Sequence, residues 1–129
     1  MNTSSWNQSD KMKSRTAEIK LTIDLDGDKL PTRISWQASE AENPGPTNCQ
    51  SAMLSMWDSE SKTTAAIDLW TQEMTIEDMN LYVYQVIHKL ADTYLRATRD
   101  KEIADVIHEF GDGFGKTLGL SNMDISESG

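Results

Sequence analysis

The stretch from Phe110 to Thr117, FGDGFGKT, ends in the way a phosphate-binding loop ends, with Gly115, Lys116 and Thr117. A P-loop reads G-x-x-x-x-G-K-[ST], and its backbone N–H groups cradle phosphates while the lysine reaches the terminal ones. In this register the first glycine should stand at position 110, where the sequence has phenylalanine. A P-loop also joins a strand to the next helix, whereas these glycines follow a helical pattern. We therefore favour a glycine-weakened helix over a nucleotide-binding enzyme.

The two histidines, His88 and His108, fall on different predicted helices and have no HxxxH or HExxH spacing. They could form a metal pair only if the two helices brought them together, because metal ligands must converge on one point. Histidines on helix flanks are more often ordinary interface residues. We therefore expect no metal ion and no other cofactor.

The remaining candidates for catalysis are Asp58, Asp68 and Cys49. Paired carboxylates work as acid and base when their environments separate their pKa values, and nothing in the sequence arranges this for the two aspartates. Cys49 is alone in a predicted loop with no assignable base, which makes it a weak nucleophile. The sequence therefore predicts no catalytic residue, and we expect a protein that is not an enzyme.

Composition narrows the class of partner. The chain has 129 residues, a single cysteine and a net charge of −9. This charge disfavours nucleic acid, whose phosphates would repel the protein, and no apolar run approaches the ~18 residues of a membrane helix. The polar N-terminus lacks the apolar segment of a secretory signal. We expect a cytoplasmic protein with a protein partner and no membrane insertion.

Hydrophobic periodicity predicts four strands and then two helices. Residues 18–25 and 32–38 alternate apolar and polar side chains, which is typical of half-buried strands. A loop over 39–50 follows, and then come strands over 51–57 and 64–70. Thr75 and Asp100 are expected to cap the two helices. The expected fold is α+β, a four-stranded antiparallel sheet in ββββαα order with both C-terminal helices packed on one face. One domain should span 17–120, between a disordered leader (1–16) and a disordered tail (121–129).

The last two strands differ from the first pair because they carry apolar residues on both faces. If the helices cover one face, then Met53, Trp57, Ala66 and Trp70 point the other way. The 39–50 loop or the leader could shield the two indoles. Alternatively, these four residues form a partner-binding patch, since Trp and Met are enriched in interface cores. Exposed sheet edges and an apolar second face also predict a homodimer or a higher oligomer.

Several strings resemble the gliding-motility protein GldC family of Bacteroidetes. They are Met53-Leu54-Ser55-Met56-Trp57-Asp58, Ile67-Asp68-Leu69-Trp70-Thr71 with Met74, Ala91-Asp92-Thr93-Tyr94, Arg96-Ala97-Thr98 and Ile34-Ser35-Trp36. The resemblance covers about residues 17–120. It implies a small accessory protein of cell gliding without known catalysis or cofactor, and it supplies no catalytic residues.

Two functions of different classes follow. The first is an accessory protein that binds a component of the gliding or secretion machinery through the Trp/Met face. The alternative is a chaperone-like holdase for unfolded or secreted chains, by analogy with acidic export chaperones of the SecB type, which have a similar order of four strands and two helices.

Overall fold

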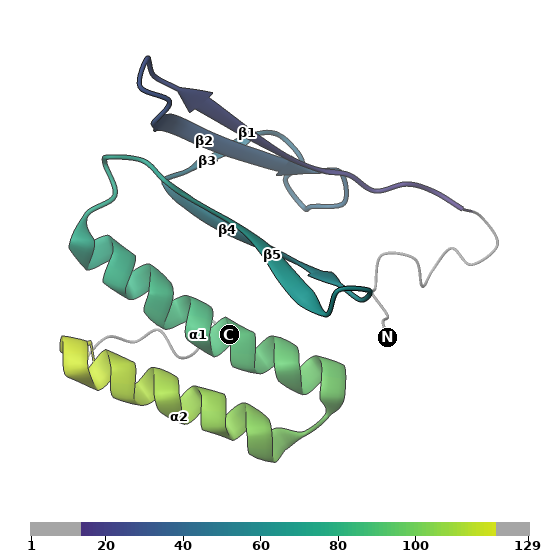
Figure 1. Ribbon diagram of the computed structural model, residues 1–129, viewed down its shortest axis with the longest axis vertical. Coiled ribbons are helices and arrows are strands. Elements are labelled where there is room, and N and C mark those ends of the chain that lie inside the picture. The colour runs from purple at the N-terminus through teal and green to yellow at the C-terminus, as the bar shows by residue number, and fades with distance from the viewer. Residues whose placement is uncertain (1–13, 121–129) are drawn as a thin grey trace. The chain divides into compact units, whose positions relative to one another are not determined.

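The structure is a computed structural model that describes residues 14–120 (Figure 1). These residues form two compact units, the strands up to Met74 and the helices from Thr75 onward. The predicted α+β class is confirmed, with five strands followed by two helices in the described part of the chain. The predicted tail over 121–129 and most of the predicted leader over 1–16 lie outside the described residues. Packing of the helices on one face of a sheet stays a prediction.

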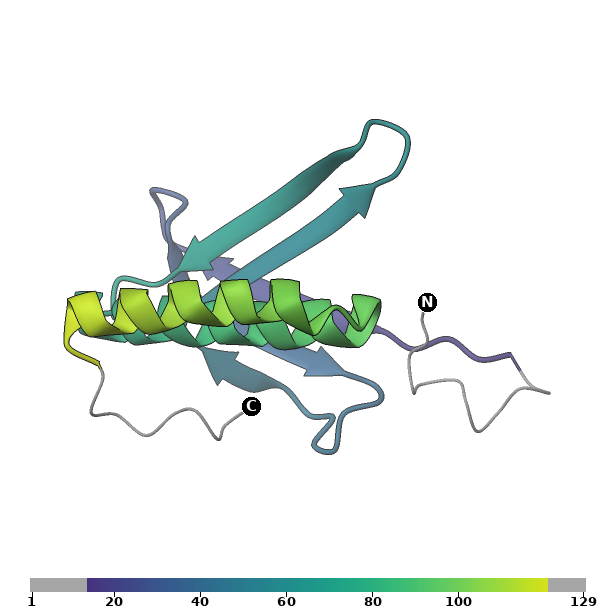
Figure 2. The ribbon, with the colours of Figure 1, turned by 90° about the horizontal axis from the view of Figure 1, so that it is seen from below.

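The strands form two antiparallel sheets, so the prediction of a single four-stranded sheet was wrong. The first sheet has the order β1 (Ile19–Leu25), β2 (Pro31–Ala38), β3 (Thr47–Cys49), and the second pairs β4 (Ser51–Asp58) with β5 (Thr63–Trp70). Figure 2 shows the β4–β5 hairpin as an extended ribbon of two strands joined by a short turn.

The single sheet does not form because segment 47–58 changes its pairing partner at Gln50. Residues before Gln50 pair with β2, and residues after it pair with β5. The Thr71 N–H donates a hydrogen bond of 2.9 Å to the Gln50 carbonyl and closes the second ladder at this point. Strand β3 was hidden in the predicted 39–50 loop because its residues, Thr-Asn-Cys, show no apolar alternation.

The buried centre of the strand unit lies where the two sheets meet. Contacts between β2 and β5 join the sheets. Ile34 of β2 is completely buried, and Thr71, directly after β5, is only 4% exposed. Trp36, which the alternation places on the same side of β2 as Ile34, remains partly exposed. The strand unit therefore has a small core of its own.

Both helices begin at their predicted caps. Thr75 and Asp100 each accept a hydrogen bond from the backbone N–H three residues on, at 3.0 Å and 3.2 Å. Helix α1 spans Ile76–Thr98, and α2 spans Lys101–Leu118 with Gly119 as its left-handed C-cap. The α2 helix is thus unbroken through its glycines, as the apolar spacing predicts.

The two helices lie side by side (Figure 1) along a seam of small residues. Ala91 of α1 and Ala104, Gly111 and Gly115 of α2 are all buried. A β-carbon on Gly115 would overlap the Tyr84 ring, and one on Gly111 would lie 2.7 Å from Nε2 of His88. These two glycines therefore let the rings of α1 lie directly on the α2 backbone.

The large apolar side chains of α2 lie beside this seam. The apolar residues at helical spacing along α2 are Ile103, Val106, Ile107, Phe110, Phe114 and Leu118, and four of these six are exposed, with Phe110 at 65%. In contrast to the two seam glycines, Gly113 faces open space, next to Phe110 and Phe114. The helix–helix contact is thus made by small residues and aromatic or imidazole rings.

Candidate functional site

The four residues predicted to bind a partner share one face of the β4–β5 hairpin. The register sets Met53 opposite Asp68, Ser55 opposite Ala66, Trp57 opposite Thr64 and Ser51 opposite Trp70. Opposed residues point to the same side of a sheet, and so do alternate residues along a strand. Met53, Trp57, Ala66 and Trp70 therefore form one surface, called here the Trp face.

The Trp face is a strip with an indole at each end. Trp57 lies beside the turn and Trp70 beside Ser51 at the other end, six residues away along β4, which corresponds to about 20 Å. Met53 and Ala66 lie between them. Both indoles are more than half exposed, at 63% and 56%, and Met53 is 44% exposed. The strip thus offers two separate aromatic anchor points.

The opposite face of the same hairpin is more uniformly apolar. It carries Ala52, Leu54, Met56, Ala65, Ile67 and Leu69. Its first polar pair is Asp58 with Thr63, beside the turn. The large side chains of its middle, Leu54, Met56 and Ile67, are all exposed. Both faces of this two-stranded sheet therefore present apolar side chains.

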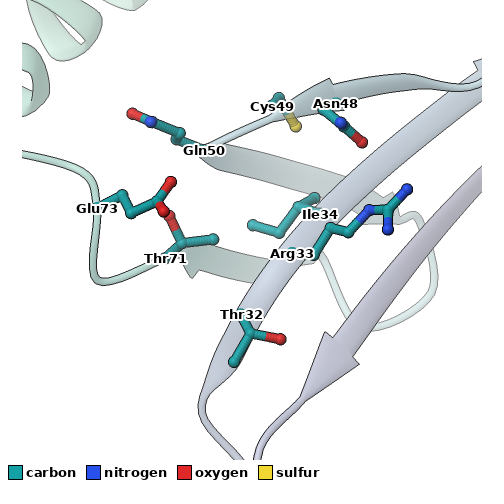
Figure 3. A pocket seen from close by; sticks show the side chains of 8 residues that line it. All are labelled: Thr32, Arg33, Ile34, Asn48, Cys49, Gln50, Thr71 and Glu73. Carbon is teal, nitrogen blue, oxygen red and sulfur yellow. The ribbon is translucent and has the colours of Figure 1, made fainter.

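A polar pocket of about 320 Å³ opens in the strand unit at the junction of its sheets (Figure 3). It is lined by Thr32, Arg33, Ile34, Asn48, Cys49, Gln50, Thr71 and Glu73. Glu73 lies next to Thr71, and the Arg33 guanidinium points away from Glu73 (Figure 3). The Thr71 hydroxyl is buried and has no hydrogen-bond partner in the described structure. A small group able to hydrogen bond is therefore what this pocket could hold.

The two histidines meet between α1 and α2. From the sequence, such a contact was the condition for a metal pair. Nδ1 of His88 lies 2.6 Å from Nδ1 of His108. Asp92 lies near the second nitrogen of His108, and Asp112 near the second nitrogen of His88. The signal available in the sequence was the spacing of Leu81, Tyr84, His88 and Leu95, which form a second and weaker stripe on the first helix. The sequence does not give the register between the two helices, so it could not predict that His108 lies opposite His88.

The other candidates are not brought together. Asp58 and Asp68 lie on opposite faces of the β4–β5 hairpin. Hydrogen bonds from the Ser61 hydroxyl and N–H to Asp58 lower the pKa of that carboxyl, which is turn chemistry. Cys49 lies half-buried on β3 opposite Ile34. These residues form no arrangement of nucleophile and base.

Lys116 and Thr117 lie in the last turn of α2. A phosphate site of this kind uses the free N–H groups at a helix N-terminus. A helix C-terminus presents carbonyl groups and the negative end of the helix dipole. The end of the FGDGFGKT stretch therefore has the wrong polarity for a phosphate.

Comparison with protein families identifies the chain. Residues 31–120 match the family described as gliding motility-associated protein GldC-like. The chain belongs to the GldC-like family. The matched region starts at β2 and extends two residues beyond α2, so β1 lies outside it. The resemblance read from the sequence is confirmed, and the GldC-like family is not a known enzyme family. Comparisons with curated proteins and with solved structures found no match.

Two absences among the described residues bear on the kind of site. None of the helices among residues 14–120 is long and apolar enough to cross a membrane. The same residues contain no group of three or more His, Cys, Asp or Glu side chains that could hold a metal ion.

Proposed function

We propose that this GldC-like chain is a non-enzymatic accessory protein of gliding motility that binds a protein partner through the Trp face. The observation that carries the proposal is the exposure of Trp57 and Trp70 on one face of a two-stranded sheet. A two-stranded hairpin is at best marginally stable in water and needs a covering surface. Tryptophan side chains that become buried in an interface are also among those that most often dominate its binding energy.

The geometry supports an extended, mainly apolar epitope on the partner. The two indoles lie about 20 Å apart, with Met53 and Ala66 between them. They would contact two pockets or ridges on the partner, joined by a flatter apolar strip. Asp68 is the acidic residue within the strip, opposite Met53, and the chain carries a net charge of −9. A basic rim around the partner's apolar epitope would complement both. A component of the gliding or secretion machinery, met in the cytoplasm, is the partner we propose.

Cross-linking mass spectrometry in the native cell would identify the partner, and calorimetry with the purified pair would test the surface. Trp57→Ala and Trp70→Ala should each weaken binding by at least tenfold, since hot-spot residues contribute about 2 kcal/mol or more. Phe110→Ala is the matched control because it removes an equally exposed aromatic ring from α2. Equal affinity for wild type and both Trp variants would contradict the proposal.

A holdase function is the alternative, and the opposite face of the hairpin favours it. Its continuous apolar surface could hold unfolded chains without reading their sequence. Saturable binding of an unfolded test protein that is lost in Leu54→Ser and Ile67→Ser, but kept in Trp57→Ala, would support this function. Binding of one defined partner that is lost in Trp57→Ala, but kept in Leu54→Ser and Ile67→Ser, would support the accessory function.

We also propose that the chain forms a homodimer or a higher oligomer. The two strands of the second sheet pair only with each other, so each has an outer edge without a strand partner in the described structure. Such edges and an apolar face invite pairing between copies. Light scattering at micromolar concentration should give at least twice the mass of one chain, and a monomer there would contradict the proposal.

A further inference from the structure

The imidazole rings of His88 and His108 meet head to head between α1 and α2. Their Nδ1 atoms are 2.6 Å apart, the ring centroids are 4.9 Å apart and the ring planes differ by 26°. The centroid separation exceeds the nitrogen–nitrogen distance by about two ring radii. The nitrogens therefore point at each other almost in the plane of both rings, in contrast to rings that overlap face to face.

Each ring has a carboxylate on its far side. Nε2 of His108 lies 3.3 Å from Oδ1 of Asp92, and Nε2 of His88 lies 3.5 Å from Oδ1 of Asp112. The second distance is too long for a good hydrogen bond, in agreement with the buried Nε2 of His88 having no hydrogen-bond partner in the described structure. Asp92 is therefore the stronger of the two partners.

A carboxylate beside one ring nitrogen favours a proton on that nitrogen and leaves a lone pair on the other. Asp92 therefore favours an N–H at Nε2 of His108 and a lone pair at its Nδ1, and His88, whose Nε2 has no hydrogen-bond partner in the described structure, then donates from its own Nδ1. The 2.6 Å contact is thus an N–H···N hydrogen bond, and its proton occupies the place between the two nitrogens that a cation could take. Asp92 thus orients His108 as carboxylates orient metal-binding histidines elsewhere, and Asp112 lies near Nε2 of His88, which would carry the ring proton once a cation took its place at Nδ1.

We propose that Nδ1 of His88 and Nδ1 of His108 bind a divalent ion of the zinc class, in place of the proton that the short contact otherwise requires. Imidazole nitrogen suits Zn²⁺, Cu²⁺ and Ni²⁺. Zinc–nitrogen bonds of about 2.0–2.1 Å at a tetrahedral angle need the two nitrogens about 3.3 Å apart. The rings must therefore separate by less than 1 Å. Both side chains are partly exposed, His88 at 23% and His108 at 36%, which leaves the ion a path from solvent.

The site is open. No group of three or more metal-binding side chains is found in the described residues, so water would complete the coordination sphere. Open zinc sites usually have three protein ligands and closed structural ones have four, so this site has fewer protein ligands than either class. We expect binding to weaken in acid because protons compete for the same nitrogens.

Gly111 is part of this site although it has no ligand atom. A β-carbon there would lie 2.7 Å from Nε2 and 2.9 Å from Cε1 of His88. Alanine at position 111 must therefore displace the His88 ring from His108. Alanine at position 113, two residues along the same helix, meets no atom within 4 Å. The pair Gly111→Ala and Gly113→Ala thus separates ring placement from the general effect of a glycine-to-alanine change.

The test is calorimetric titration of Zn²⁺ into the full chain without a histidine tag, at neutral pH. The wild type should bind one ion per chain. His88→Gln and His108→Gln should each lower the affinity at least tenfold, and Asp92→Asn by about tenfold, as is typical when an orienting partner is lost. Gly111→Ala should weaken binding, and Gly113→Ala should leave it unchanged.

A measurement on the unaltered chain keeps the test decisive if a histidine variant does not fold. Nitrogen-15 NMR of the imidazoles should show zinc shifting the two Nδ1 resonances, with much smaller changes at Nε2. Failure of the wild type to bind zinc at millimolar concentration would overturn the proposal. Unchanged affinity in folded His88→Gln and His108→Gln would do the same, because the ion would then be held elsewhere.

Discussion

The seam between α1 and α2 and the β4–β5 hairpin use opposite kinds of side chain. The seam buries alanine and glycine against the rings of Tyr84 and His88. The hairpin leaves large apolar side chains exposed on both of its faces, Trp57 among them. The hairpin thus exposes large apolar side chains, whereas the buried residues of the seam are small.

The difference teaches that burial in this chain follows steric fit. The rings of His88 and Tyr84 reach the α2 backbone only where no β-carbon intervenes, and the seam meets this condition at Gly111 and Gly115. Large side chains need a complementary surface, which a two-stranded hairpin cannot supply from within itself. The seam is thus complete within the helix unit, whereas the hairpin does not cover its own apolar faces.

The largest expected effect concerns the seam. Gly115→Ala should lower the free energy of unfolding by about 1–2 kcal/mol, because the new methyl group overlaps the Tyr84 ring and overpacking costs of this order are usual. Gly113→Ala is the matched control and should raise it by about 0.5–1 kcal/mol through helix propensity alone. Urea unfolding followed by circular dichroism measures both. If the two variants were equally stable, Gly115 would have no packing role.

A second change concerns the centre of the strand unit. Thr71→Val should raise the free energy of unfolding by about 1 kcal/mol, since it removes a buried hydroxyl without a partner and keeps a β-branched side chain. Denaturant unfolding measures the change. A loss of stability would mean instead that the hydroxyl is hydrogen bonded to a group held in the polar pocket.

Local chemistry was predictable from the sequence. The strand alternation, the caps Thr75 and Asp100 and the continuity of α2 through its glycines depend on neighbours within a few residues, and each is confirmed. Alternation also put the four residues of the Trp face on one side of their strands. Their role in binding stays a prediction.

What could not be predicted depends on register between distant segments. Strand β3 consists of three residues without apolar alternation, so only its pairing with β2 reveals it and splits the predicted sheet. The contact between His88 and His108 depends on the register of the two helices. Gly111 and Gly115 set this register through contacts with His88 and Tyr84, which lie 23 and 31 positions earlier in the chain. No spacing within one helix encodes that contact.

A third change tests the exposed side chains of the β4–β5 hairpin. Trp57→Ala should change the free energy of unfolding of the isolated chain by no more than about 0.5 kcal/mol, as is usual for exposed positions. The same variant should bind the proposed partner at least tenfold more weakly. Thermal unfolding and calorimetry on one preparation separate the two effects. A large loss of stability would show that the indole is buried within the chain's own assembly, and the Trp face would then belong to the core.

The smallest expected effect lies at the turn of the hairpin. The Ser61 hydroxyl, followed by the Ser61 N–H, donates to Asp58 and holds the pKa of this carboxyl below its ordinary value of 3.8. A carboxyl whose pKa is lower in the folded state stabilises that state above the unfolded pKa, and the stabilisation disappears as the pH falls through 3.8 towards the folded value. Because Asp58 is fully exposed, the contribution should be small. Thermal unfolding over this acid range should show a slightly steeper loss of stability for wild type than for Asp58→Asn. Ser61→Ala, which keeps the carboxyl and removes its strongest donor, should reduce the slope in the same direction. An unchanged slope in both variants would mean that the hydrogen bonds from Ser61 to Asp58 contribute nothing to the acid sensitivity of the hairpin.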